Sequence, residues 1–319
     1  MQRSHLLDLL RIFAIVLVFV AHFGQLLDSN VGQFFGVKNF YYVSLGGVGV
    51  SLFLVLSGLL AGLTGLARPT PYTHYIWKKL KRIYPIYWLT IPFCFSGYLL
   101  KELLLGSGVP EPFPNGFMLD IVGSVTGLYA WIGLWGGPYN PPSWFIGLIL
   151  TMYLIFPLLA ACLRRAPHLT LGLFFFISAS SRWYVGQYGL PFTDKNMLDQ
   201  VEGWLYRQYG FMPGRPGDWF PLCRLFEFAL GIWLAQTVSS KFWCKWNLGK
   251  GKWLAFLSDL SFPLFLLHYP FLFIVPWLSD LGMAIPLAIS LFMIMLCSMA
   301  YAVVEVEKRL FSLKERATP

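Results

Sequence analysis

The sequence contains few charged residues for its length. Asp, Glu, Lys and Arg make up 12% of the 319 residues, whereas hydrophobic residues make up 57% and the mean hydropathy is +0.61. Soluble domains carry about 25% charged residues, so this composition excludes a soluble protein and predicts a polytopic membrane protein. The net charge is +9, but the basic residues cluster in short loops beside apolar segments. Membrane orientation accounts for such clusters, and we expect no nucleic-acid partner.

Several motifs of soluble enzymes are missing as well. There is no Walker phosphate loop, no GxSxG nucleophile elbow and no HExxH zinc helix. Their absence argues against ATP hydrolysis and zinc chemistry. The five cysteines include no CxxC pair, so we interpret them as free thiols and expect neither a disulfide nor a metal site.

Apolar runs long enough to cross a bilayer recur along the chain, which we treat as a single domain over residues 1–319. A spanning helix needs about 20 apolar residues. The segment Phe117–Trp135 is weaker, because Asp120 and several glycines interrupt it, and we interpret it as re-entrant or interfacial. A count of ten spans is the alternative. The prediction is an all-α transmembrane helix bundle whose eight spans are Leu6–Leu27, Ser44–Leu66, Tyr84–Leu105, Trp144–Leu163, Leu169–Val185, Trp219–Val238, Leu260–Ser279 and Ala284–Val304.

The positions of the basic residues predict the orientation. With both termini in the cytoplasm, sixteen Lys and Arg residues fall on the cytoplasmic side and at most six on the other. This is a strong positive-inside bias. Residues 186–218 then form a long non-cytoplasmic loop, whose length is typical of lids and binding elements. Residues 305–319 form a short cytoplasmic tail.

Arg11 and His22 lie within the first apolar run. Ionisable residues at membrane depth are costly, so their presence there indicates a functional site. The two residues are eleven positions apart, which places them on nearly the same helix face, about 16 Å apart along the axis. Asp8 lies one turn before Arg11 on that face, and we expect the two to pair.

Two other places combine ionisable residues with apolar surroundings. His268 falls near the middle of a span between Pro263 and Pro270; an imidazole there either takes a proton from a hydroxyl or makes a structural hydrogen bond between helices. Arg224 and Glu227 form an i,i+3 pair. That pair is either a neutralised structural pair or a site where Arg224 faces the entrance for an acceptor.

A basic run, which includes Lys81 and Arg82, directly precedes the third span. It is typical of a topology signal in contact with anionic lipids. It would equally hold the phosphates of a cytoplasmic cosubstrate, because the guanidinium fork matches phosphate oxygens. The second span is rich in glycine, which permits close helix approach.

Seven short blocks along the chain resemble the acyltransferase 3 family of integral membrane O-acyltransferases. One departure is Ser51, at a position where the family often has an acidic residue. The blocks follow the family's order and cover most of the chain: Asp8–Arg11 with His22, Gly49–Gly58, Arg82–Tyr87, Pro142–Gly147, Tyr153–Pro157, Arg224–Gly231 and Ser261–His268.

The resemblance implies a stand-alone membrane acyltransferase. Its donor would be a cytoplasmic acyl-CoA, with acetyl as the acyl group, and its acceptor a hydroxyl of an extracytoplasmic carbohydrate or lipid-linked glycan. His22 would act as general base, supported by His268, and Arg11 or a backbone donor would stabilise the oxyanion. The implied donor-binding residues are Arg11, Ser57, Lys81, Arg82 and Tyr87, and the implied acceptor-binding residues are Asp8, Trp144, Arg224 and Glu227.

The resemblance also implies a bacterial cytoplasmic membrane as the location, with membrane lipids as partners. Acyl chain length would depend on the space near Phe53, Phe145 and Phe265. The competing class is a proton-coupled exporter of a sugar, lipid or small acid. Such transporters usually contain internal inverted repeats, and none is apparent in this sequence. An exporter would not consume acyl-CoA, which distinguishes the two classes.

Overall fold

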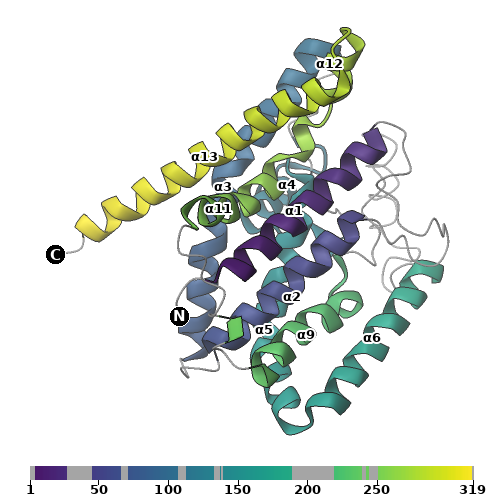
Figure 1. Cartoon of the computed structure of the whole chain (residues 1–319), viewed down its shortest axis with the longest axis vertical. Helices are drawn as coiled ribbons and strands as arrows, with labels where there is room; N and C mark the ends of the chain where they lie inside the picture. The colour runs from purple at the N-terminus through teal and green to yellow at the C-terminus, as the bar shows by residue number, and fades with distance from the viewer. Residues whose placement is uncertain are drawn as a thin grey trace.

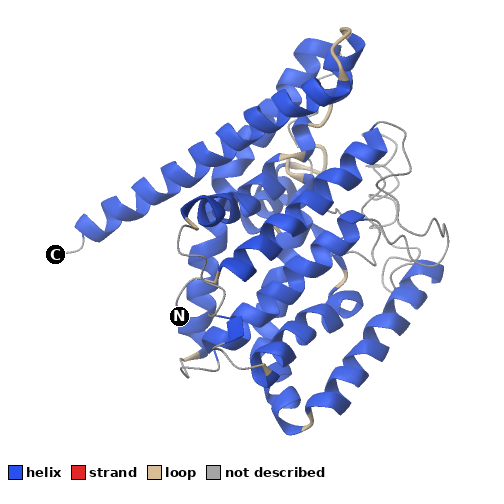
Figure 2. Ribbon diagram, in the orientation of Figure 1, coloured by secondary structure: helices blue, strands red, loops and turns tan. Residues whose placement is uncertain are grey.

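We describe a computed structural model of the chain, which covers residues 4–26, 45–65, 71–106, 113–132, 137, 139–188, 219–238, 242–243 and 251–317. Over these residues the fold is helical, without strands (Figure 2). This confirms the all-α prediction. The predicted loop over residues 186–218 lies outside the described residues from 189 onward, and the single domain over residues 1–319 stays a prediction.

The described residues form ten α-helices and four short 3₁₀ turns. The α-helices are α1 (His5–Leu26), α2 (Leu45–Gly65), α3 (Tyr72–Leu105), α4 (Phe117–Thr126), α5 (Trp144–Arg165), α6 (Pro167–Tyr188), α9 (Leu225–Thr237), α11 (Lys252–Leu267), α12 (Ile274–Asp280) and α13 (Ile285–Ala317). Short 3₁₀ turns are η2 (Tyr129–Ile132), η3 (Pro141–Ser143), η4 (Pro221–Arg224) and η5 (Tyr269–Phe271). The expected C-terminal tail continues α13 as helix.

Five of these helices are long and apolar enough to cross a membrane, namely α1, α2, α3, α5 and α13. A sixth span results if α11 and the segment Tyr269–Asp280, which are bent by 65° at their junction, cross together. Six of the eight predicted spans correspond to these elements. The other two predicted spans are helical as α6 and α9, but neither is long and apolar enough to qualify. With 13 residues, α9 is only about 20 Å long, shorter than the hydrocarbon core.

The predicted re-entrant segment contains a short helix. α4 has only ten residues, about 15 Å of helix, which cannot span a bilayer. It ends at Gly127, whose φ of 69° requires the left-handed backbone conformation that glycine adopts without strain. The following turn, η2, contacts α5. The position and length of α4 agree with the re-entrant or interfacial interpretation.

Glycines bring α2 into close contact with two neighbours. Figure 1 shows α1 and α2 running side by side, with α9 next to α2. A Cβ on Gly49 would lie 2.5 Å from the Ala14 carbonyl oxygen of α1, and one on Gly58 would overlap the Phe228 carbonyl oxygen of α9. Gly231 of α9 faces Gly58 in return: its Cβ would lie 3.0 Å from the Gly58 carbonyl carbon and would overlap the Val55 carbonyl oxygen. Small residues permit such backbone contact within membranes. The expectation drawn from the glycine-rich span is confirmed.

Candidate active site

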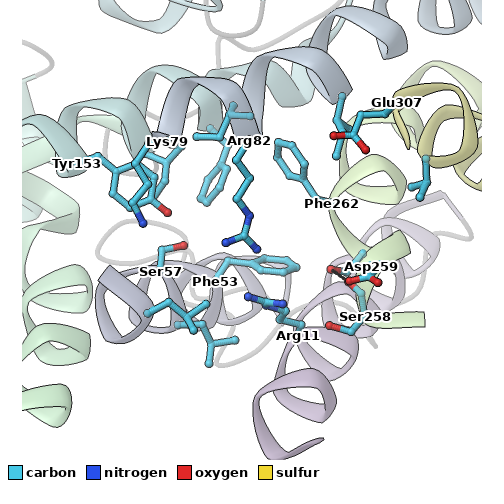
Figure 3. Close-up of a pocket in the computed structure, with 18 of the residues that line it drawn as sticks. Arg11, Phe53, Ser57, Lys79, Arg82, Tyr153, Ser258, Asp259, Phe262 and Glu307 are labelled. Carbon is cyan, nitrogen blue, oxygen red and sulfur yellow. Dashed lines mark hydrogen bonds between the residues drawn. The ribbon is translucent and has the colours of Figure 1, made fainter. Parts of the chain in front are cut away.

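A cavity of about 370 Å³ lies among α1, α2, α3, α5, α11 and α13 (Figure 3). Its charged lining residues are Arg11, Lys79, Arg82 and Lys308, together with Asp259 and Glu307. The four cations exceed the two anions by two positive charges. In Figure 3 the side chains of Arg11 and Arg82 extend into the cavity from α1 and α3. The cavity is therefore suited to an anionic molecule.

Contacts within the bundle hold two of these cations. Arg11 Nη1 lies 3.9 Å from Asp8 Oδ1, and Asp8 is buried, so the predicted pair is confirmed. Lys79 Nζ lies 4.4 Å from the centre of the Tyr153 ring and 5.4 Å from that of Tyr75. Aromatic faces attract cations at such distances. Both side chains are thereby positioned on the cavity wall before a ligand arrives.

The structure brings together only some of the residues predicted to bind the donor. Arg11, Ser57 and Arg82 line the cavity, but Lys81 and Tyr87 do not. Lys81 Nζ lies 5.3 Å from the centre of the Trp77 ring, on an exposed part of α3. Tyr87 is 1% exposed and belongs to the core. Lys79 belongs to the same basic run but was not singled out as a donor-binding residue, although it lies three residues before Arg82 and therefore on the same helix face.

The two predicted histidines meet elsewhere in the bundle. The rings of His22 on α1 and His268, at the end of α11, have centroids 4.9 Å apart. Tyr269 lies against the His22 ring, with centroids 5.8 Å apart. Neither histidine lines the cavity. His268 lies at the 65° bend between α11 and the segment Tyr269–Asp280.

The backbone fixes the tautomer of neutral His268. Its Nδ1 lies 2.7 Å from the Phe265 carbonyl oxygen. Because a carbonyl only accepts hydrogen bonds, Nδ1 carries the hydrogen, and in the neutral imidazole Nε2 then has the lone pair. Nε2 is buried and has no hydrogen-bond partner among the described residues. An unsatisfied buried polar atom requires an explanation, and a catalytic role is one such explanation.

Aromatic residues surround the histidine pair. Trp144, which the family resemblance assigned to acceptor binding, is 9% exposed. Its ring lies against Phe145 and Phe265, with centroids 5.9 and 6.5 Å away. The Phe265 ring in turn lies 5.9 Å from that of His268. Trp144 therefore belongs to a packed aromatic cluster beside the histidines.

Arg224 and Glu227 are buried and belong to a polar cluster that also includes the half-buried Arg182 and Ser51. Arg224 Nη1 lies 3.1 Å from Glu227 Oε1 and donates to Ser51 Oγ at 2.9 Å. Arg182 on α6 also pairs with Glu227 and donates through Nε to the Cys223 carbonyl at 2.7 Å. Two guanidinium groups thus share one carboxylate. Because Arg224 is 2% exposed, this geometry favours the structural interpretation of the pair.

Removal of the Glu227 charge should destabilise the fold. In Glu227→Gln the two arginines would face a neutral amide, and loss of one partner in a buried ion pair costs about 3 kcal/mol or more. The matched control is Glu305→Gln, which removes the exposed i,i+3 contact with Lys308 at 3.0 Å and should cost less than about 1 kcal/mol. Thermal unfolding of both variants in one detergent compares them. Equal losses would show that the buried cluster is not stabilised by its charges.

Residues 5–240 match the acyltransferase 3 family, described as an acyltransferase domain. The chain is also 26% identical over 245 residues to acyltransferase MdmB of Streptomyces mycarofaciens, an alignment that covers 73% of this chain and 57% of MdmB. No solved structure matches the chain. Because the family match covers well over half of the sequence and the helices are long and apolar enough to span a membrane, the chain is an integral membrane protein that belongs to the acyltransferase 3 family.

Proposed function

We propose that the protein transfers an acyl group from acyl-CoA to a hydroxyl of a carbohydrate or lipid-linked glycan. The acyl group that we propose is acetyl. The observation that carries this proposal is the arrangement along α1. Arg11 lies at the cationic cavity, and His22 on the same helix lies against His268. A phosphate-bearing donor would thus bind at one end of the helix and react at the other.

The cavity suits the phosphates of the donor. Its volume is within the range of small-molecule sites. Arg11 and Arg82 present planar guanidinium groups, which bind phosphate oxygens with two parallel hydrogen bonds. Since Arg11 is about 16 Å from His22 along one continuous helix, the geometry favours phosphate binding over oxyanion stabilisation as its role.

The histidines supply the proton chemistry. In the proposed step, His22 removes the proton from the acceptor hydroxyl while the oxygen attacks the thioester carbonyl. The carbon–sulfur bond then breaks, the CoA sulfur leaves with a proton, and an ester remains on the acceptor. The lone pair of His268 Nε2 would accept a hydrogen bond from the acceptor or from His22. A buried site that positions both reactants supplies much of the remaining rate.

The orientation follows from the location of the donor. Acyl-CoA is cytoplasmic, so the cavity would open to the cytoplasm and the acceptor would approach from the other face. Arg11 near the start of α1 and Arg82 in the first half of α3 are then on the cytoplasmic side, as the positive-inside bias predicts. This proposal includes a bacterial cytoplasmic membrane and cytoplasmic termini.

The direct test uses purified protein in nanodiscs with radiolabelled acetyl-CoA. We expect free CoA to appear when a glycan extract is present and labelled acetyl to be recovered on a component of that extract. If the protein neither binds nor consumes acetyl-CoA with any acceptor, a longer acyl donor or the exporter class replaces this proposal.

Substitution of Arg11 tests where the donor binds. Arg11→Lys keeps the charge but loses the bidentate geometry, and loss of a charged hydrogen bond of about 1.5 kcal/mol raises KM for acetyl-CoA about tenfold. As a control, Lys81→Ala removes a cation of the basic run on α3 that lies outside the cavity, and we expect less than a twofold change in KM. Initial rates against acetyl-CoA concentration give both values. A larger effect of Lys81→Ala would place the phosphates outside the cavity.

A further inference from the structure

The cavity and the histidine pair are separate in this structure. Three turns of α1 lie between Arg11 and His22, and the cavity lining includes neither histidine. If the phosphates of the donor bind at Arg11 and Arg82, its thioester reaches His22 only by passing through the intervening part of the bundle.

Three phenylalanines from three helices occupy this part of the bundle. Phe53 of α2, Phe145 of α5 and Phe265 of α11 have ring centroids 6.4, 6.0 and 5.4 Å apart in their three pairings. All three pairs meet edge to face, a favourable aromatic geometry. We refer to these three residues as the phenylalanine triad.

The triad connects the cavity with the histidines. Phe53 and Phe145 line the cavity, whereas Phe265 contacts both of their rings and also the ring of His268. Phe145 and Phe265 are 6% and 5% exposed. The triad therefore forms a continuous chain of ring contacts from the cationic cavity to the imidazole of His268.

We propose that the phenylalanine triad is a seal that keeps the water of the cytoplasmic cavity away from the histidine pair and opens when the arm of the donor enters, so that it limits hydrolysis of the thioester. This inference rests on the proposed transfer reaction. A base that activates a hydroxyl would also activate water. The water oxygen would then attack the thioester carbonyl, the carbon–sulfur bond would break, and acetate and CoA would form without an acceptor. Exclusion of water prevents this side reaction.

A smaller side chain in the triad should open the seal. In Phe145→Ala we expect the ratio of free acetate to acetylated acceptor to rise several-fold over wild type. This ratio does not depend on the amount of folded protein. The matched control is Phe156→Ala, on the same helix with 5% exposure, whose ring stacks on Tyr75 with centroids 5.2 Å apart. The control should keep the wild-type ratio even if its yield falls.

A second variant and a second readout separate the seal from the transfer reaction. Phe53→Ala alters a half-buried member of the triad and should also raise the ratio. In liposomes without acetyl-CoA, both triad variants should conduct protons faster than wild type and Phe156→Ala. Wild type that fails to transfer acetyl would overturn the proposed function, whereas triad variants with an unchanged ratio and unchanged proton flux would overturn the seal.

Discussion

Replacement of His22 by alanine is expected to leave a folded, membrane-inserted protein that transfers almost no acyl group. His22 is only half-buried, and its truncation removes one ring from the contact with His268 and Tyr269. General-base catalysis contributes about 10²- to 10⁴-fold to a rate, so the acyl-transfer rate should fall by that factor. The measurement is the initial rate of labelled ester formation from acetyl-CoA at saturating acceptor.

His168→Ala is the matched control for this experiment. His168 is on α6, with its ring 5.8 Å from that of Trp233, and it lies in neither the cavity lining nor the histidine pair. We expect this variant to keep the wild-type rate of ester formation and the wild-type elution volume in size-exclusion chromatography. If His22→Ala retains wild-type activity, another group is the base, and His268 is the first residue to substitute next.

Replacement of Gly231 by alanine should cause a large loss of stability. The added methyl group would overlap the Val55 carbonyl oxygen and lie 2.5 Å from the Leu59 nitrogen. Overpacking costs about 1–3 kcal/mol where side chains can adjust. Because backbone atoms of α2 form this contact, we expect about 3 kcal/mol or more. Thermal unfolding in detergent should show a large decrease in the midpoint, or the variant should fail to accumulate.

Gly172→Ala provides the comparison, because a Cβ at Gly172 would meet nothing within 4 Å. Alanine is favoured over glycine within a helix by about 1 kcal/mol, so this variant should be slightly more stable than wild type. The two substitutions add the same methyl group with opposite expected signs. If both variants unfold at the same temperature, the contact between α2 and α9 is not tight.

Local patterns in the sequence predicted the features that lie along single helices. Asp8 and Arg11 are three residues apart on α1 and form the expected ion pair, because helix geometry alone brings such positions together. The glycines of the second span predicted close helix approach, because residues without a side chain leave room for a neighbouring backbone. The sequence also marked His22 and His268 separately, since ionisable residues are rare at membrane depth.

Features that depend on how helices pack against one another could not be predicted in this way. Arg182 joins Glu227 across 45 residues of chain, and nothing near Arg182 in the sequence indicates this partner. The basic run contains several cations, but the rotation of α3 about its axis decides that Lys79 and Arg82 line the cavity while Lys81 does not. The contacts among the three phenylalanines also depend on helix packing. The family resemblance placed all three near the acyl chain, but the sequence did not predict that their rings are in contact.

The continuity of α1 has a consequence for donor selection. No glycine or proline occurs between Arg11 and His22, so the helix has neither a hinge nor a kink over this stretch. The rise per residue therefore acts as a molecular ruler of about 16 Å. If Arg11 binds the phosphates, the protein selects donors by the length of the arm between the phosphates and the thioester. A thioester with a shorter arm would bind the same cations and still leave its carbonyl short of the imidazole.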